Sequence, residues 1–336
     1  MSTVQPFPQT IEYWLPVIEE AVGGFHVVEL LETRLSWIYL TTQHVYKIKK
    51  PLDLGASHNW SEAHRRQACL DEVRLNERLA PGVYLGVLPI VEESNGAVRL
   101  NGRGLSIEYA IKMRRLHGER SLSHLIEHNA LSNEQVKSLA QWLTDFYKRL
   151  APESIDVDTY CGRVLRRLHQ NSETLKNADG FTPPSDVGQI ESRLSLFVHQ
   201  SREDLNVRVV DGRIVDGHGD LRADHVFFDR QPLIIDCTEY SANIRTLDAL
   251  DDLAALAVDC EYLGRTDVGE QLLQQYRKEA HDDGPPAIEA FYKALHAMAR
   301  AAEVLESHRR TGKPITSDSG IAAWLEIAFR YCSWLE

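Results

Sequence analysis

Two aspartates and a histidine near the middle of the chain form the pattern most able to do chemistry. The segment His218-Gly219-Asp220-Leu221-Arg222-Ala223-Asp224-His225 is followed, after an apolar run, by Ile234-Ile235-Asp236. Phosphoryl transfer needs little covalent help and much positioning: one carboxylate orients the attacking hydroxyl, and others fix metal ions that bridge the phosphates. Asp220 and Asp236 could supply these carboxylates if both faced one pocket.

The spacing of these residues matches the signature of protein kinases. In that signature an Asp is the catalytic base, a metal ligand follows five positions later, and a second Asp at the end of a strand holds Mg²⁺. The corresponding residues here are Asp220, His225 and Asp236. Arg222 could neutralise charge on the transferred phosphoryl group, and His218 is expected to support the loop.

Short strands are expected around this segment. Residues 215–217 end a strand-like run at a turn, residues 226–228 and 232–235 are typical of two strands, and residues 229–231 are typical of the hairpin between them. Such a hairpin would bring the two aspartates close together.

A nucleotide-dependent reaction also needs a cation for the α- and β-phosphates, which protein kinases supply as a Lys on the third strand. The run 45–50, Val-Tyr-Lys-Ile-Lys-Lys, offers three lysines. Because side chains alternate across a strand, Val45 and Lys47 share one face, where Val45 could line the adenine slot and Lys47 could reach the phosphates. Lys49 is the alternative to Lys47.

The partner of this lysine is expected on the helix predicted for residues 62–80. Glu72 shares a face with Ala68 and Leu75, the stripe that should pack against a sheet, so its carboxylate can reach inward toward Lys47. In isolation such charged residues are usually solvated at the surface. Their combination with the aspartate segment favours a site.

The pattern along the chain predicts an α+β protein with a two-lobed protein-kinase-like fold. We expect a leading helix within residues 1–22, a small antiparallel β-rich lobe that binds the nucleotide over 23–116, and a larger helical lobe with the catalytic loop and substrate site over 117–336. Strands are predicted at residues 25–32, 37–41, 44–49, 83–91, 97–100 and 106–113. Helices are predicted at residues 133–150, 187–207, 248–263, 268–281, 288–307 and 321–335.

Composition narrows the classes of partner. The chain has 336 residues, 43% hydrophobic content and a formal net charge of −12. Nucleic-acid binding is not expected, because phosphate backbones need a concentrated basic surface. A cationic substrate would suit the acidic balance, but many proteins are acidic for solubility alone, so net charge does not choose a substrate.

The chain shows no membrane or disulfide signal. No window reaches the roughly 18 apolar residues of a spanning helix, and the start lacks a basic region followed by an apolar stretch, so we expect a cytoplasmic protein with no membrane partner. Five scattered cysteines without a Cys-x-x-Cys pair are expected to be reduced and buried.

With these residues in view, the chain resembles the aminoglycoside phosphotransferase family, including a poorly characterised branch with some members fused to a P-loop ATPase domain. The resemblance covers about residues 10–310 and is carried by residues 46–51, 72–81, 84–87, 113–116, 218–221 and 234–236. It implies transfer of the γ-phosphoryl group of ATP to a hydroxyl of a small molecule, with Mg²⁺. It also implies that ATP binds between the lobes near Lys47 and Met113.

The chain departs from better-known members of that family. His225 stands where they have Asn, and imidazole is less typical of Mg²⁺, so a preference for Mn²⁺ could follow. The Gly-rich phosphate loop is missing, and Ser36 or Arg34 could replace its contacts. Glu239, three residues after Asp236, is similar to the second acid of choline and ethanolamine kinases and could lie near the metal.

Two other functions remain open at this stage. A pseudokinase that binds nucleotide without transfer would explain the missing glycines. A metal-dependent hydrolase could use His218, Asp220 and His225 to activate water, but it leaves Lys47 and Asp236 without roles. Residues 251 and 252, both Asp, lie near the start of a predicted helix that the family resemblance places behind the catalytic loop, where an acid commonly anchors backbone amides, so we expect them to be structural.

Overall fold

The computed structural model describes residues 10–23, 27–51, 61–177, 186–316 and 319–335. The chain divides into two compact units. Unit 1 comprises Met1–Gly118 and Leu233–Tyr240, and unit 2 comprises Glu119–Pro232 and Ser241–Glu336. The sequence pattern placed everything after residue 116 in the helical lobe, whereas the structure assigns residues 233–240 to unit 1.

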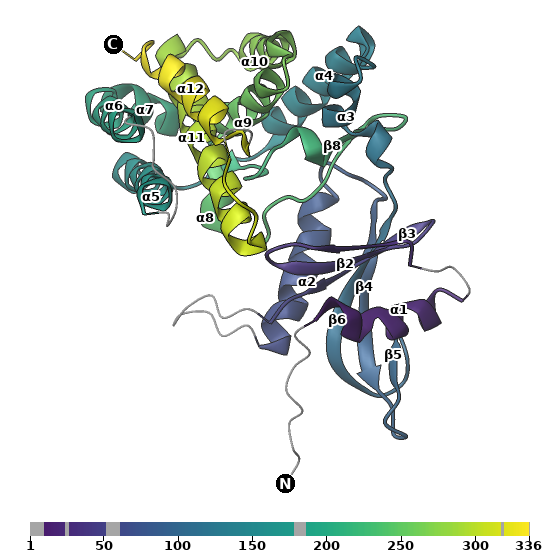
Figure 1. The fold of residues 1–336 in the computed structure, drawn as a ribbon. Helices are drawn as coiled ribbons and strands as arrows, with labels where there is room; N and C mark the ends of the chain where they lie inside the picture. Colours follow the sequence, from purple (N-terminus) through teal and green to yellow (C-terminus); the bar gives the residue numbers. More distant parts are fainter. Residues whose placement is uncertain (1–9, 24–26, 52–60, 178–185, 317–318, 336) are drawn as a thin grey trace. The chain divides into compact units, whose positions relative to one another are not determined.

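Unit 1 is built on a six-stranded antiparallel sheet with strand order β1-β2-β3-β6-β4-β5 (Figure 1). Its strands are β1 (Glu29–Glu32), β2 (Ser36–Leu40), β3 (His44–Lys49), β4 (Tyr84–Glu92), β5 (Val98–Leu100) and β6 (Leu105–Arg114). The predicted strands are therefore confirmed, with ends shifted by a few residues. The part of the first prediction over residues 25 and 26 lies outside the described residues.

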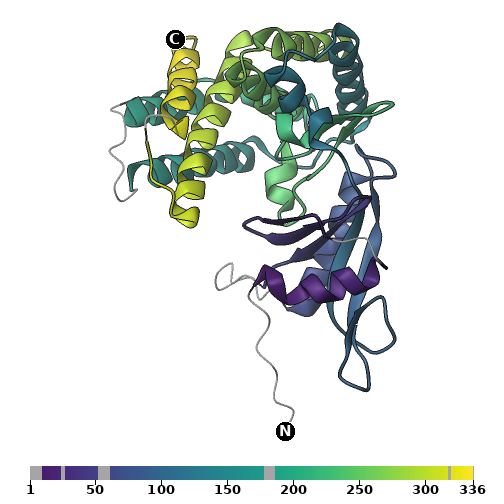
Figure 2. The ribbon, with the colours of Figure 1, turned by 45° about the vertical axis from the view of Figure 1, so that its right-hand side comes forward.

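The two faces of this sheet carry different chemistry. On one face, the short helices η1 (Ile11–Trp14) and α1 (Leu15–Ala21) contribute Trp14 and Ile18 to an apolar cluster with Trp37, Tyr39 and Ile48. On the other face lies α2 (Glu62–Asn76), which begins at the N-cap Ser61 (Figures 1 and 2). Because side chains alternate along β3, Lys47 and Lys49 face α2 while Tyr46 and Ile48 face α1.

The segment Leu233–Tyr240 is fixed to the end of α2 and to the turn that follows it. The N–H of Ile234 donates to the carbonyl of Leu79 at 3.2 Å, and the N–H of Cys237 donates to Oδ1 of Asn76 at 2.9 Å. These bonds make the segment part of unit 1. They bring Asp236 and its neighbours to the α2 face of the sheet.

Unit 2 is mainly helical. Its α-helices in the described residues are α3 (Leu122–Glu127), α4 (Asn133–Arg149), α5 (Val157–Lys176), α6 (Asp186–Gln200), α7 (Arg202–Val210), α8 (Ala242–Arg245), α9 (Ala249–Tyr262), α10 (Thr266–Glu279), α11 (Pro286–Thr311) and α12 (Ile321–Cys332). Two 3-10 turns accompany them: η2 (Gly118–Arg120), which begins at the last residue of unit 1, and η3 (Ala223–His225). The short strands β7 (Ile214–Asp216) and β10 (Thr246–Asp248) pair antiparallel. β8 (Val226–Phe228) is joined by the predicted turn to β9 (Pro232–Ile234), whose last two residues belong to unit 1, and in this turn the N–H of Asp229 donates to the carbonyl of Gln231.

The helix α9 forms the core of unit 2, since every residue from Ala249 to Cys260 is buried. One predicted element was wrong: residues 187–207 are not a single helix but two, α6 and α7, which meet at Ser201. The apolar periodicity continues across the break, which explains the error. In the described ranges, no helix combines the length and the apolar character needed to cross a bilayer.

Candidate functional site

Two lysines of β3 and three carboxylates form a continuous ion-pair network in unit 1. Nζ of Lys47 lies 2.8 Å from Oε1 of Glu72 and 2.7 Å from Oδ1 of Asp236. Nζ of Lys49 lies 2.6 Å from Oε2 of the same glutamate and 2.5 Å from Oε1 of Glu239. The predicted pairing of Lys47 with Glu72 is confirmed, and the alternative lysine binds the other oxygen of that carboxylate.

Burial makes this network electrostatically demanding. Burial opposes the charge on Lys47, but Asp236 and Glu72 outweigh it and raise its pKa well above the ordinary value. Burial would likewise raise the pKa of Glu72, but the two lysines lower it below the usual value, so the carboxylate is ionised. For Glu239 burial prevails over Lys49 and raises the pKa. The network therefore holds its charges by mutual compensation.

Asp236 is the exposed end of this network. Its side chain is 43% exposed, whereas that of Glu72 is fully buried. Its backbone has a φ of 64°, in the left-handed region that non-glycine residues seldom adopt, and its N–H donates to the hydroxyl of Tyr84 at 3.3 Å. A partly exposed carboxylate at the edge of a fixed segment is the oxygen donor that Mg²⁺ prefers, so the residue fits a metal.

Val45 and Met113 lie opposite each other on neighbouring strands β3 and β6. Val45 is half-buried and Met113 is buried, and both are on the face that carries Lys47. An apolar surface therefore lies beside the lysine, as an adenine slot requires. That adenine binds there stays a prediction.

The connection between β1 and β2 is a turn held by the side chain of Thr33, and it contains no glycine. The hydroxyl of Thr33 accepts the N–H of Leu35 at 3.3 Å and the N–H of Ser36 at 2.9 Å. These amides are thus used within the turn. Ser36 is fully buried across from Lys49, and its Oγ has no hydrogen-bond partner within the described ranges, while Arg34 is exposed. Their predicted contacts with phosphates stay predictions.

In unit 2, the loop before Asp220 is anchored by α9. Oδ2 of Asp252 accepts the N–H of His218 at 2.5 Å and Oδ1 accepts the N–H of Gly219 at 3.0 Å, which confirms the structural role predicted for this acid. Burial raises the pKa of Asp252 to about 6 even though these bonds favour its charged form. His218 is fully buried, and its Nδ1 accepts the N–H of Asp220 at 3.3 Å.

The carboxylate of Asp220 is held by arginines. Nε of Arg222 lies 2.5 Å from its Oδ1, and Nη1 of Arg300 lies 3.8 Å from the same atom. Burial opposes ionisation, but Arg222, His225 and then Arg300 lower the pKa of Asp220 below its usual value. One third of the side chain is exposed, so an ionised carboxylate is presented to solvent.

Sequence reasoning missed the residues of α11 in this arrangement. Arg300 binds both oxygens of Asp259 at 2.9 and 2.8 Å, and Glu303 accepts from Arg300 at 3.1 Å and from Arg222 at 2.6 Å. They lie some 80 positions after the catalytic segment. No local pattern links them to it, because only the packing of α11 brings them to Asp220.

The predicted metal residues divide between the units. Nδ1 of His225 lies 2.9 Å from the carbonyl oxygen of Asp220, in unit 2, whereas Asp236 and Glu239 belong to unit 1. Among the residues that the structure describes, no group of three His, Cys, Asp or Glu side chains could hold a metal ion. That these residues bind one metal stays a prediction, and Glu239 is occupied by Lys49.

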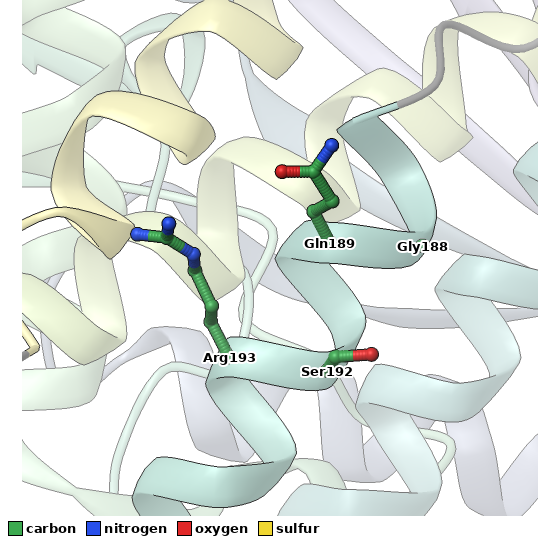
Figure 3. A pocket seen from close by; sticks show the side chains of 4 residues that line it. All are labelled: Gly188, Gln189, Ser192 and Arg193. Atoms are coloured by element: carbon green, nitrogen blue, oxygen red, sulfur yellow. The ribbon is translucent and has the colours of Figure 1, made fainter.

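Two surface hollows in unit 2 are lined by residues other than those predicted for the site. One is lined by Gly188, Gln189, Ser192 and Arg193, all from α6 (Figure 3). Another lies between the end of α7 and the turn after α10. The candidate site therefore rests on the ion-pair network and the Asp220 loop.

Comparison with known proteins identifies long relatives of unknown function. No protein-family model matches the chain. Uncharacterized proteins of Mycobacterium bovis and Mycobacterium tuberculosis are 31% identical over 277 residues, which is 82% of this chain and 54% of each relative. The chain thus spans about half the length of the curated relatives it matches.

Solved structures show the class of fold. A choline/ethanolamine kinase family protein from Mesorhizobium loti has a TM-score of 0.55 at 14% identity, covering 96% of this chain and 92% of that one. A thermostable mutant of an aminoglycoside phosphotransferase has 0.53 at 14% identity, covering 95% and 97%. An aminoglycoside phosphotransferase from Streptomyces rimosus, in complex with ADP and streptomycin, has 0.51 at 16% identity, covering 86% and 97%.

The fold of this chain is therefore the α+β protein-kinase-like fold that aminoglycoside phosphotransferases and choline/ethanolamine kinases share. The fold class predicted from the sequence is confirmed. Function has to be argued from the site, because one fold hosts many activities.

Proposed function

We propose that this protein is an ATP-dependent phosphotransferase that moves the γ-phosphoryl group to a hydroxyl of a small molecule. The observation that carries the proposal is the pairing of Lys47 with both Glu72 and Asp236 on one face of the sheet. A strand lysine held by a helix glutamate, next to an acid that fits a metal, is the arrangement that kinases use for phosphates. The fold and the Asp220 loop agree with it.

Each residue has a definite task in this proposal. The ammonium of Lys47 contacts the α- and β-phosphates, and Glu72 holds it in place. Asp236 and His225 hold the metal, which when bound supplies positive charge to the phosphate oxygens. The carboxylate of Asp220 orients the acceptor hydroxyl and takes its proton as the new O–P bond forms and the bond to ADP breaks.

Lys49 and Glu239 give the nucleotide half of the site its rigidity. By binding the second oxygen of Glu72, Lys49 fixes the rotation of that carboxylate, which keeps the first oxygen toward Lys47. By binding Glu239, it ties the segment that carries Asp236 to β3. Preorganisation of this kind reduces the reorganisation needed when a charged ligand arrives.

The experiment is a search for ATP-dependent gain of one phosphoryl group by mass spectrometry, over metabolites and amino sugars, with Mg²⁺ or Mn²⁺. With an acceptor in hand, Asp220→Asn should lose at least about 100-fold in rate and still bind nucleotide. The matched control is Asp224→Asn, an exposed acid in the same loop, which should keep full activity. Unchanged turnover in the Asp220 variant would remove this residue as the base.

A pseudokinase is the second candidate, and one observation favours it. The turn before β2 uses its amides internally through Thr33, so it offers fewer N–H groups to phosphates than a glycine loop would. Tight nucleotide binding without transfer to any compound, together with absent ATP hydrolysis, would favour this role. The hydrolase alternative has less support, because Nδ1 of His218 and Nδ1 of His225 are both engaged in shaping the Asp220 loop.

A further inference from the structure

A row of donor side chains runs along one face of α5. Arg163, Arg167 and Asn171 are spaced four residues apart and so lie one above another on the helix. The same face begins at Tyr160, whose hydroxyl lies 2.8 Å from that of Tyr292 on α11, so the two helices are held side by side (Figures 1 and 2). The row therefore faces α11 within unit 2.

Each member of this row has a buried donor that is not used. Nη1 of Arg163, Nε of Arg167 and Nδ2 of Asn171 are closed to water and have no hydrogen-bond partner among the residues that the structure describes. Buried donors are almost always paired in proteins, because an unpaired one costs free energy. Three unpaired buried donors on one helix face therefore indicate a site for an acceptor group of a ligand.

The row leads to the catalytic carboxylate. Nη2 of Arg167 lies 2.9 Å from each oxygen of Asp251, and Nε2 of His296 lies 2.6 Å from Oδ1 of the same acid. One turn further along α11, about 6 Å by helix geometry, stands Arg300, whose Nη1 lies 3.8 Å from Oδ1 of Asp220. Through Asp251 and α11, the row is therefore connected to the residues that hold the proposed base.

The charge along the row that has no opposite partner is the positive charge of an arginine. Asp251 is occupied by Arg167, and Asp259 binds Arg300 through both oxygens. Arg163 forms no ion pair within the described ranges. An ammonium group would find no uncompensated carboxylate here, whereas an oxyanion would find a guanidinium able to bind two of its oxygens.

We propose that the phosphoryl acceptor carries an oxyanion, either a carboxylate or a phosphate ester, and that the α5 row binds it with Arg163 as the main charged contact. This inference rests on the proposed function and adds the class of its acceptor. It separates this chain from proteins of the same fold whose names refer to aminoglycosides, choline and ethanolamine, which are amines or quaternary ammonium compounds.

Calorimetric titration tests the proposal with four probes of similar size: D-glycerate, glycerol 3-phosphate, glycerol and ethanolamine. The two anions should bind more tightly than the neutral and cationic compounds, and the difference between them tells carboxylate from phosphate. Arg163→Gln should weaken anion binding at least about 10-fold, the effect expected for a charge-assisted contact. Arg166→Gln, the exposed neighbour on α5, should leave it unchanged.

Two further variants decide where the anion binds and what Arg163 does. Lys47→Met should keep the affinity for the anions. If this variant lost anion binding while Arg163→Gln kept it, the anion would bind at the lysine proposed for the nucleotide, and the proposal would be overturned. Arg163→Gln should unfold at the same temperature as the wild type or higher, because it removes a donor without a partner. A marked fall in unfolding temperature would assign Arg163 a structural role and overturn the proposal.

The two levels of proposal fail in different ways. If an amine is phosphorylated and neither anion binds, the acceptor class is wrong while the phosphotransferase stands. If the anions bind through Arg163 and no compound gains a phosphoryl group, the anion site stands while the phosphotransferase does not.

Discussion

Replacing Lys49 by methionine should destabilise the protein far more than the loss of a surface lysine. The ammonium is 2% exposed and binds Glu72 and Glu239. The network contains two ammonium groups and three carboxylates, so the substitution changes its net charge from −1 to −2, and the charge is lost at its buried end. Removing one partner of a buried pair costs about 3–5 kcal/mol. We expect about 3 kcal/mol at about pH 8, since Glu72 keeps Lys47.

The loss of unfolding free energy in Lys49→Met should depend on pH, and the charges of the network determine the direction of that dependence. Burial raises the pKa of Glu239, and Lys49 only partly opposes it, so removal of the lysine raises the folded-state pKa further. A carboxyl whose folded pKa lies above its unfolded pKa stabilises the fold at low pH, and this contribution is lost as pH rises through the folded pKa. The loss of stability should therefore be smaller near pH 5, by about 1.4 kcal/mol per unit of added pKa shift.

Unfolding curves in guanidinium chloride at these two pH values measure both effects. Adding Glu239→Gln to Lys49→Met restores the net charge of the network to −1 and should recover most of the lost free energy. The control Lys137→Met, an exposed lysine of α4, should stay within about 0.5 kcal/mol of the wild type. A loss below about 1 kcal/mol at the higher pH, as for an exposed pair, or an equal loss at both pH values, would refute the reasoning.

Three further predictions follow from single contacts. Glu72→Gln removes the charge that both lysines share and should weaken ATP binding at least about 10-fold in equilibrium titrations, whereas Glu77→Gln, an exposed acid after α2, should not. Burial raises the pKa of Cys69 to about 12, so iodoacetamide should alkylate it only after unfolding, as peptide mapping can show. In Gly217→Ala the new methyl carbon would lie 2.5 Å from Oδ2 of Asp252, which is too close for an unstrained contact. The midpoint of thermal unfolding should therefore fall, and phosphoryl transfer should slow several-fold. An unaltered midpoint would show that the loop adapts to the methyl group.

The sequence indicated the sheet of unit 1 well because its strands are short runs rich in apolar and aromatic residues, separated by polar or turn-forming residues. β3 spans His44–Lys49, as the pattern predicted, and the parity of the strand put Lys47 and Lys49 on the face of α2. Helical spacing from Ala68 to Leu75 likewise placed Glu72 inward. These are local rules, which is why a contact between residues 25 positions apart could be predicted.

The rest depended on long-range packing. The break between α6 and α7 at Ser201 leaves the apolar period intact, so periodicity could not reveal it. The second arginine beside Asp220, Arg300, comes from α11, and the role of Lys49 depends on Glu239 from a segment 190 positions away. No spacing rule connects such positions, because they are far apart in the sequence and meet only through the packing of the folded chain.

The backbone of Asp236 allows its function to be separated from its contribution to stability. A non-glycine residue at positive φ costs of order 1 kcal/mol or more, and Asp236→Gly would relieve that cost while losing a half-exposed ion pair worth about 0–1 kcal/mol. The free energy of unfolding should thus change by less than about 1 kcal/mol. ATP binding measured with and without Mg²⁺ should nevertheless lose its metal dependence in this variant. If Mg²⁺ still tightened ATP binding as in the wild type, Asp236 would not be the metal ligand, and the strain at this position would need another explanation.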